Sequence, residues 1–120
     1  MNEISIYFFE DNELTEFMFQ EKEYRTDVIV KIGNNYFNPD VITPHRLMID
    51  FKCMIENVGF YECDPCLILV EDLSKKNIIE TILKLNDAGY FLKLKPSTFE
   101  IICSNHGDAS TNIDDWIRVY

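Results

Sequence analysis

The sequence of 120 residues is poor in basic side chains, and this scarcity limits the partners that it can bind. Lysine and arginine number 11 against 21 aspartates and glutamates, which gives a formal net charge of −10 at pH 7. A surface that binds nucleic acid needs a stripe of basic side chains to neutralise phosphates. The sequence offers no such stripe, so direct binding of DNA or RNA is disfavoured.

Glycine, proline and long apolar runs are also scarce. The chain has four glycines, none with the spacing of a dinucleotide-binding or Walker phosphate loop. Its apolar runs are much shorter than the roughly 20 residues that span a bilayer. The acidic start at Glu3 is unlike the basic start of a signal peptide. We therefore expect a cytoplasmic protein, a monomer or weak dimer that does not bind membranes.

Two of the four cysteines, Cys63 and Cys66, have the C-x-x-C spacing of a redox pair or half a zinc site. In a reducing cytosol we expect free thiols. A redox pair opens a helix, whose N-terminus lowers the thiol pKa, whereas this motif precedes a predicted strand. A zinc site needs four ligands, and the other cysteines and histidines form no second close pair. No metal or cofactor is predicted, and a zinc or thiol protein that uses Cys63 and Cys66 is kept as an alternative.

Hydrophobic periodicity predicts an α+β fold, with one domain over residues 1–120. We expect an antiparallel sheet of about five or six strands with two main helices packed on it. The central strand is predicted at Leu67–Val70, an uninterrupted apolar run. It leads into an amphipathic helix that Ser74 caps and Gly89 ends.

The other elements are predicted from turns, caps and alternation. Thr43 and Pro44 open a second helix that ends at Gly59. Strands are predicted over residues 3–9 and 28–32, and a tight turn at residues 33–35 leads into a return over residues 36–38 and 41–42, which Pro39 interrupts. Residues 14–20 fit a helix or a strand, and their phenylalanines favour a strand that returns as a hairpin. The last strand is predicted at residues 98–103.

No catalytic residues are predicted. Cys103, His106 and Asp108 have the residue types of a nucleophile, base and orienting carboxylate. Such triads are assembled from separate elements of a fold, so closeness along one loop is weak support. We interpret this stretch as a polar loop and do not expect an enzyme.

The negative charge is concentrated at the two ends of the chain. Residues 1–27 hold eight acidic and two basic residues. Residues 28–95 hold nine acidic and eight basic residues, and residues 96–120 hold four acidic residues and one basic residue. An acidic surface with an aromatic anchor is typical of contacts with a basic protein. The alternatives are ordinary solvated charge and packing of the tryptophan on the core. The predicted partner-binding residues are Glu10, Asp11, Glu13 and Glu16 in a first cluster, and Asp114, Asp115 and Trp116 in a second cluster.

Three stretches carry a resemblance to a known class of proteins. They are Ile4-Ser5-Ile6-Tyr7-Phe8-Phe9-Glu10, Asp27-Val28-Ile29-Val30-Lys31-Ile32-Gly33-Asn34-Asn35-Tyr36-Phe37, and the Pro-led helix with Arg46-Leu47. Over roughly the first 90 residues the chain resembles bacterial immunity proteins of contact-dependent growth inhibition (polymorphic toxin) systems. The resemblance implies a cytoplasmic protein that binds the C-terminal toxin domain delivered by a neighbouring cell, commonly a nuclease, and blocks its active site.

Other binding functions agree with the same composition. An acidic nucleic-acid mimic, or an adaptor protein that inhibits another nucleic-acid-binding protein, has the same acidity and differs in its partner. An ordinary regulatory subunit would have no competitive role. The partner therefore discriminates among these functions.

Overall fold

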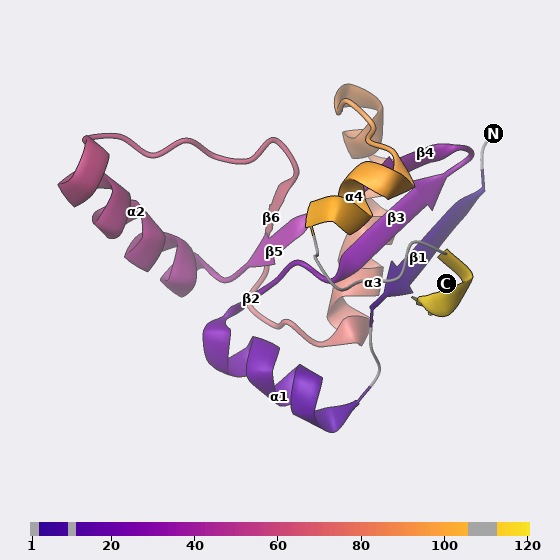
Figure 1. The fold of residues 1–120 in the computed structure, drawn as a ribbon, viewed down its shortest axis with the longest axis horizontal. Coiled ribbons are helices and arrows are strands. Elements are labelled where there is room, and N and C mark those ends of the chain that lie inside the picture. Colours follow the sequence, from indigo (N-terminus) through magenta and orange to yellow (C-terminus); the bar gives the residue numbers. More distant parts are fainter. Residues whose placement is uncertain (1–2, 10–11, 106–112) are drawn as a thin grey trace.

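A four-stranded antiparallel sheet forms the centre of the computed structural model (Figure 1). The structure describes residues 3–9, 12–105 and 113–120. In the order β4-β3-β1-β7, the strands of this first sheet are β4 (Asn35–Phe37), β3 (Val28–Ile32), β1 (Ile4–Phe8) and β7 (Ile117–Arg118). Tyr7 of β1 lies opposite Arg118 of β7, which follows a short 3-10 helix, η2 (Ile113–Asp115). The first and last strands therefore pair.

The hairpin between β3 and β4 is confirmed. Ile32 lies opposite Asn35, and Gly33 turns the chain with a φ of 60°. This left-handed conformation costs glycine nothing and costs most other residues free energy, so the sequence signal is local and strong.

A second sheet of three strands lies beside the first. In spatial order, its strands are β2 (Tyr24–Arg25), β5 (Asp40–Ile42) and β6 (Leu67–Leu69). β2 and β5 are antiparallel, whereas β5 and β6 are parallel. The expectation of one antiparallel sheet of five or six strands is therefore wrong in strand count and pairing, although the α+β class is confirmed.

The strand predicted at residues 67–70 is present as β6, but its predicted central position is wrong. β6 is an edge strand of the second sheet, and Leu69 is 50% exposed. Ile68 and Val70 are buried, so the strand has one buried and one open face. An apolar side chain on the open face makes such a strand look continuously buried in sequence.

Helix α3 (Lys75–Asp87) packs on one face of the first sheet, as predicted. The Ser74 hydroxyl accepts a hydrogen bond from the Asn77 N–H at 3.3 Å. Gly89 has a left-handed φ of 79° just after the helix, before the 3-10 helix η1 (Tyr90–Lys93). The main core lies between helix and sheet, and its buried members are Ile6, Phe8, Val28, Val30, Phe37, Val41, Ile68, Val70, Leu73, Ile78, Ile82 and Phe91.

Residues 99–105 form a helix, α4 (Phe99–Asn105), so the prediction of a last strand at residues 98–103 is wrong. The Thr98 hydroxyl accepts a hydrogen bond from the Ile101 N–H at 3.2 Å, as a helix cap does. The buried side chains repeat at helical spacing, and this spacing outweighs their β-propensity. They form a second core on the other face of the sheet, whose buried members are Ile29, Phe99, Ile102, Cys103 and Trp116.

The hairpin interpretation of residues 14–20 is wrong, because they lie in helix α1 (Glu13–Lys22). The Asn12 side-chain oxygen accepts a hydrogen bond from the Thr15 N–H at 2.7 Å. At the other end, Glu23 takes a left-handed φ of 61° and donates its N–H to the Phe19 carbonyl at 2.9 Å. The caps therefore decide the structure, and the aromatic content does not require a strand.

Helix α2 (Pro44–Val58) projects from the rest of the molecule (Figure 1). The radius of gyration is 14.6 Å, against roughly 13.6 Å for an average domain of this length. The expectation that both predicted helices pack on the sheet is therefore wrong for α2. In the described parts of the chain, no helix is long and apolar enough to cross a membrane.

Candidate protein-binding surface

Helix α2 is defined by capping signals at both of its ends. The Thr43 hydroxyl accepts a hydrogen bond from the Arg46 N–H at 3.2 Å, and Pro44 occupies the first turn. Gly59 takes a left-handed φ of 86° and donates its N–H to the last carbonyls of the helix. These local signals fix the helix although none of its fifteen residues, all of which the structure describes, is buried.

An apolar stripe runs along α2 without a cover. Leu47, Phe51, Met54 and Val58 repeat at the spacing that places side chains on one helix face. Met48 is 53% exposed and Phe51 is 44% exposed. A contiguous apolar surface of this kind on a protein usually marks an interaction site. The exposed large apolar residues of the helix and its tip are Met48, Ile49, Phe51, Met54, Ile55, Val58 and Phe60.

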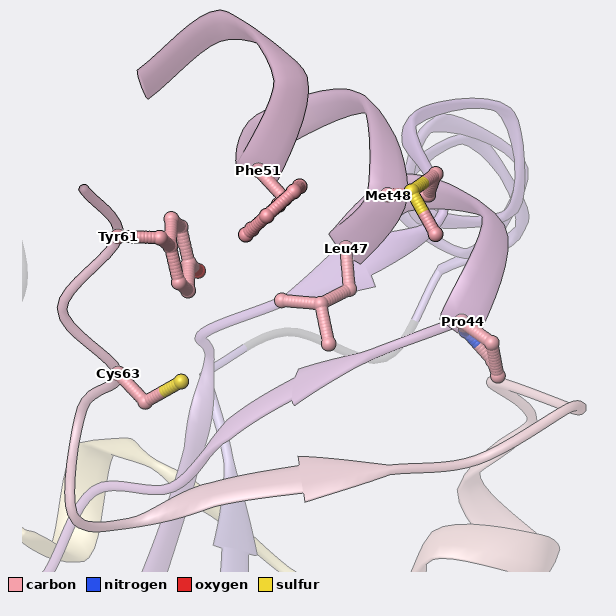
Figure 2. A pocket seen from close by; sticks show the side chains of 6 residues that line it. All are labelled: Pro44, Leu47, Met48, Phe51, Tyr61 and Cys63. Carbon is pink, nitrogen blue, oxygen red and sulfur yellow. The ribbon is translucent and has the colours of Figure 1, made fainter. Parts of the chain in front are cut away.

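The stripe opens into a pocket between the first half of α2 and the segment that returns from its tip (Figure 2). The pocket has a volume of about 470 Å³. The rings of Phe51, from α2, and Tyr61, from the return segment, lie side by side, with their centroids 6.3 Å apart. We call this pocket the α2 groove, and its lining residues are Pro44, Leu47, Met48, Phe51, Tyr61 and Cys63.

Three carboxylates lie near the α2 groove without lining it: Asp40, Asp50 and Asp64, here called the acidic trio. Asp50 and Asp64 are the chain neighbours of Phe51 and Cys63 in the lining. Burial raises the pKa of the Tyr61 hydroxyl, and the acidic trio and Cys63 raise it further. Burial also raises the pKa of Asp40, with Asp64 and Asp50 acting in the same direction. Burial is the larger cause of both shifts, and the carboxylates act in the same direction.

Helix α1 presents a second exposed apolar surface, next to the first predicted acidic cluster. Leu14, Phe17 and Met18 are exposed, and their spacing places them on one helix face. Glu13 of the cluster is exposed in the first turn, whereas Glu10 and Asp11 lie outside the described residues. The spacing of these apolar residues was the available signal for a helix, and the hairpin interpretation gave it less weight than the phenylalanine content.

Glu16, the remaining acid of the first cluster, pairs with a buried arginine. The Arg25 side chain is fully buried, and its Nη2 lies 2.7 Å from Oε2 of Glu16. Arg25 also donates two hydrogen bonds of 2.9 Å to the carboxylate of Asp27 and one of 3.1 Å to the Leu73 carbonyl. Burial lowers the pKa of Arg25, but Asp27 and Glu16 outweigh this effect and the net shift is upward. Glu16 therefore helps to hold α1 on the core.

The second predicted cluster does not present its tryptophan. Trp116 is 4% exposed, and its ring centroid lies 5.0 Å from that of Phe9 and 6.2 Å from that of Phe99. Asp115 is exposed, whereas the side chain of Asp114 lies outside the described residues. In this conformation Trp116 stabilises the second core, as its alternative interpretation expects.

The cysteines are free thiols in different environments. Cys63 is exposed, and burial raises the pKa of the Cys66 thiol to about 11, with Asp64 acting in the same direction. A redox or metal-binding thiol needs the opposite shift. Among the described residues, no group of three or more His, Cys, Asp or Glu side chains is arranged to hold a metal ion. His106 and Asp108, considered with Cys103 above, lie outside the described residues.

We expect iodoacetamide at pH 8 to alkylate Cys63 much faster than Cys66. A pKa of about 11 in place of about 9 lowers the thiolate fraction of Cys66 about 100-fold. Mass spectrometry of single Cys→Ser variants measures each rate, and in urea the two rates should converge. Equal rates in the folded protein would contradict the assigned environment.

The α2 groove thus combines an apolar lining and exposure on one projecting helix, with Asp40 and Asp64 nearby on other segments and Asp50 of α2 paired with Arg46. Searches against protein-family models, curated proteins and solved structures find no match for this chain. The geometry and charge of this surface therefore carry the functional argument.

Proposed function

We propose that this protein acts by binding another protein, as an immunity protein that neutralises a cationic toxin domain by covering its active site. The observation that carries the proposal is the uncovered apolar stripe of α2 on a chain of net charge −10. Exposed apolar side chains are stabilised when a partner covers them. Such a surface is typical of a site that binds another protein.

The charge of the chain favours a cationic partner. A toxin that cleaves nucleic acid presents a basic cleft to phosphates, and an acidic surface can occupy this cleft. The excess of ten negative charges adds long-range attraction that speeds the encounter. The resemblance to immunity proteins of contact-dependent growth inhibition systems supports the same partner.

Co-expression tests the proposal directly. We expect cells that produce the toxin domain encoded in the same gene cluster to stop growing, and co-expression of this chain to restore growth through a 1:1 complex. Growth arrest that persists despite soluble expression of the chain would contradict the proposal. Restored growth without a complex would contradict the binding mechanism.

The association rate of the complex is expected to fall steeply with salt. Charge attraction raises association rates 10- to 1,000-fold at low ionic strength, and ions screen it beyond about 10 Å at 0.1 M. Stopped-flow measurements between 20 and 500 mM NaCl, roughly the range over which the Debye length falls from above 20 to below 5 Å, give the slope. An association rate that does not change with salt would contradict a role for charge attraction in forming the complex.

The first acidic cluster can be tested separately. Changing Glu10, Asp11 and Glu13 to their amides should slow association, whereas Glu16 is left intact because it pairs with Arg25. A control that changes the exposed residues Glu71, Glu80 and Glu100 to Gln alters the net charge equally. A larger effect of the first variant supports a contact at α1, and equal effects would reject it.

The acidic nucleic-acid mimic remains the second candidate, because its partner is also cationic. Purified complexes separate the two functions: a host DNA-binding protein as the partner favours the mimic, and a toxin domain favours immunity. A zinc or thiol function is less well supported, because the pKa of Cys66 is raised to about 11.

A further inference from the structure

We infer that the α2 groove receives a large apolar side chain of the partner, flanked in the partner by a lysine or arginine. This inference rests on the proposed function, because it takes the occupant to be a segment of another protein. It adds the chemistry of the side chains that the groove binds. The groove is a different surface from the acidic cluster near α1.

The lining of the groove selects an apolar occupant. Its walls are apolar and aromatic side chains from α2 and from residues 61–63, and they line an open groove of about 470 Å³. This volume lies within the roughly 300–1,000 Å³ of sites that bury a ligand. Met48 has a flexible thioether that can adapt to the inserted group. Apolar anchors that fill such pockets usually carry most of the binding energy of an interface.

The acidic trio selects the charge of the flanking residue. Asp50 accepts a hydrogen bond from Arg46 Nε at 3.1 Å. Among the described residues, neither Asp40 nor Asp64 forms a salt bridge. Asp64 is held in place, because its Oδ1 accepts the Cys66 N–H at 2.8 Å. An incoming cation would offset the repulsion between these carboxylates, whereas an incoming anion would increase it.

The same charges disfavour a second copy of this chain as the occupant. Two copies would bring together net charges of −10 each. An apolar helix pair has to overcome this repulsion, whereas a basic partner gains attraction. The occupant with the most favourable chemistry is therefore a cationic apolar segment.

Peptide titrations followed by NMR test the inference. The probe is a synthetic 12-residue peptide with phenylalanine and leucine at helical spacing and lysine at the other positions. We expect it to shift the amide signals of residues 44–51 and 61–63 in the ¹⁵N-labelled protein. A peptide with glutamate for lysine, and one with serine for the apolar residues, should each bind at least about tenfold more weakly.

Variants assign the binding to the groove. Met48→Glu should weaken binding of the lysine peptide about tenfold or more. The control Leu92→Glu adds the same charge outside the groove, at a side chain that is 91% exposed, and should not change binding. Asp40→Asn with Asp64→Asn should reduce the preference for lysine over glutamate peptides. Unchanged amide spectra outside the substituted region verify that each variant is folded.

Three results would overturn the inference: equal binding of lysine and glutamate peptides, signal shifts away from the groove, or a dimer in sedimentation that Met48→Glu dissociates. Its failure is distinguishable from failure of the proposed function. A toxin domain that Met48→Glu still neutralises rejects the groove and leaves immunity intact. Specific peptide binding without toxin neutralisation rejects immunity and leaves the groove.

Discussion

Arg25→Met is expected to destabilise the protein by about 3–5 kcal/mol, because it leaves the buried carboxylate of Asp27 without its cation. It also removes the contacts of the guanidinium with the rings of Phe8 and Phe19, at 4.8 and 4.6 Å from their centroids. For a domain with a typical stability of about 5–15 kcal/mol, this loss is a large fraction. Urea unfolding measures it.

Two controls separate the buried ion pair from a general effect of losing an arginine. Arg118→Met removes a side chain that is 54% exposed and lies 4.0 Å from Glu3, so we expect a change of about 1 kcal/mol or less. Adding Asp27→Leu to Arg25→Met should recover part of the stability, since of the two carboxylates that Arg25 pairs only the more exposed one, Glu16, then remains. A loss below about 1 kcal/mol for Arg25→Met alone would contradict the described role.

The double variant Met48→Ala, Phe51→Ala is expected to weaken the complex with the toxin domain about 1,000-fold and to leave the free protein stable. Hot-spot side chains contribute about 2 kcal/mol or more each, which is about 30-fold in affinity. Both side chains are about half exposed in the free protein, so their truncation should change unfolding by roughly 0.5 kcal/mol each or less. Calorimetry gives the affinity, and urea unfolding gives the stability.

A matched control uses two other exposed apolar residues. Leu92→Ala with Ile101→Ala removes comparable apolar surface away from α2 and should leave the affinity within about threefold, since only interface truncations cost much binding energy. If both double variants bind equally well, the contact does not use α2. If the α2 variant unfolds at markedly lower urea, its residues serve the fold.

Two helices and one hairpin that the sequence predicted correctly have local signals. α2 has Thr43, Pro44 and Gly59 at its ends, α3 has Ser74, and the β3–β4 hairpin has Gly33. Each signal acts within one turn of the chain and does not depend on distant contacts. α1 has the same kind of cap at Asn12, but its phenylalanines misled the interpretation.

Elements that depend on distant partners were not predictable in the same way. The apolar run of β6 does not indicate whether the strand pairs on one edge or on both. Its partner β5 is 25 residues or more away in sequence. Arg25 meets the Leu73 carbonyl 48 residues further along the chain. Such contacts arise from topology, which periodicity does not encode.

The candidate site shows the same limit. The apolar stripe of α2 was visible in the sequence and predicted a helix, but the same stripe describes a buried helix and an uncovered one. The α2 groove also needs Tyr61 and Cys63, which lie in the return segment and have no periodic pattern. Conversely, Glu16 and Trp116 were chosen from composition, and their local structure turns them toward the core.

Amide hydrogen exchange of the free protein and of its complex with the toxin domain measures whether the partner covers α2. We expect residues 44–58 to exchange more slowly in the complex, because the partner covers the apolar stripe of α2. Slowed exchange confined to other elements, with α2 unchanged on binding, would contradict it.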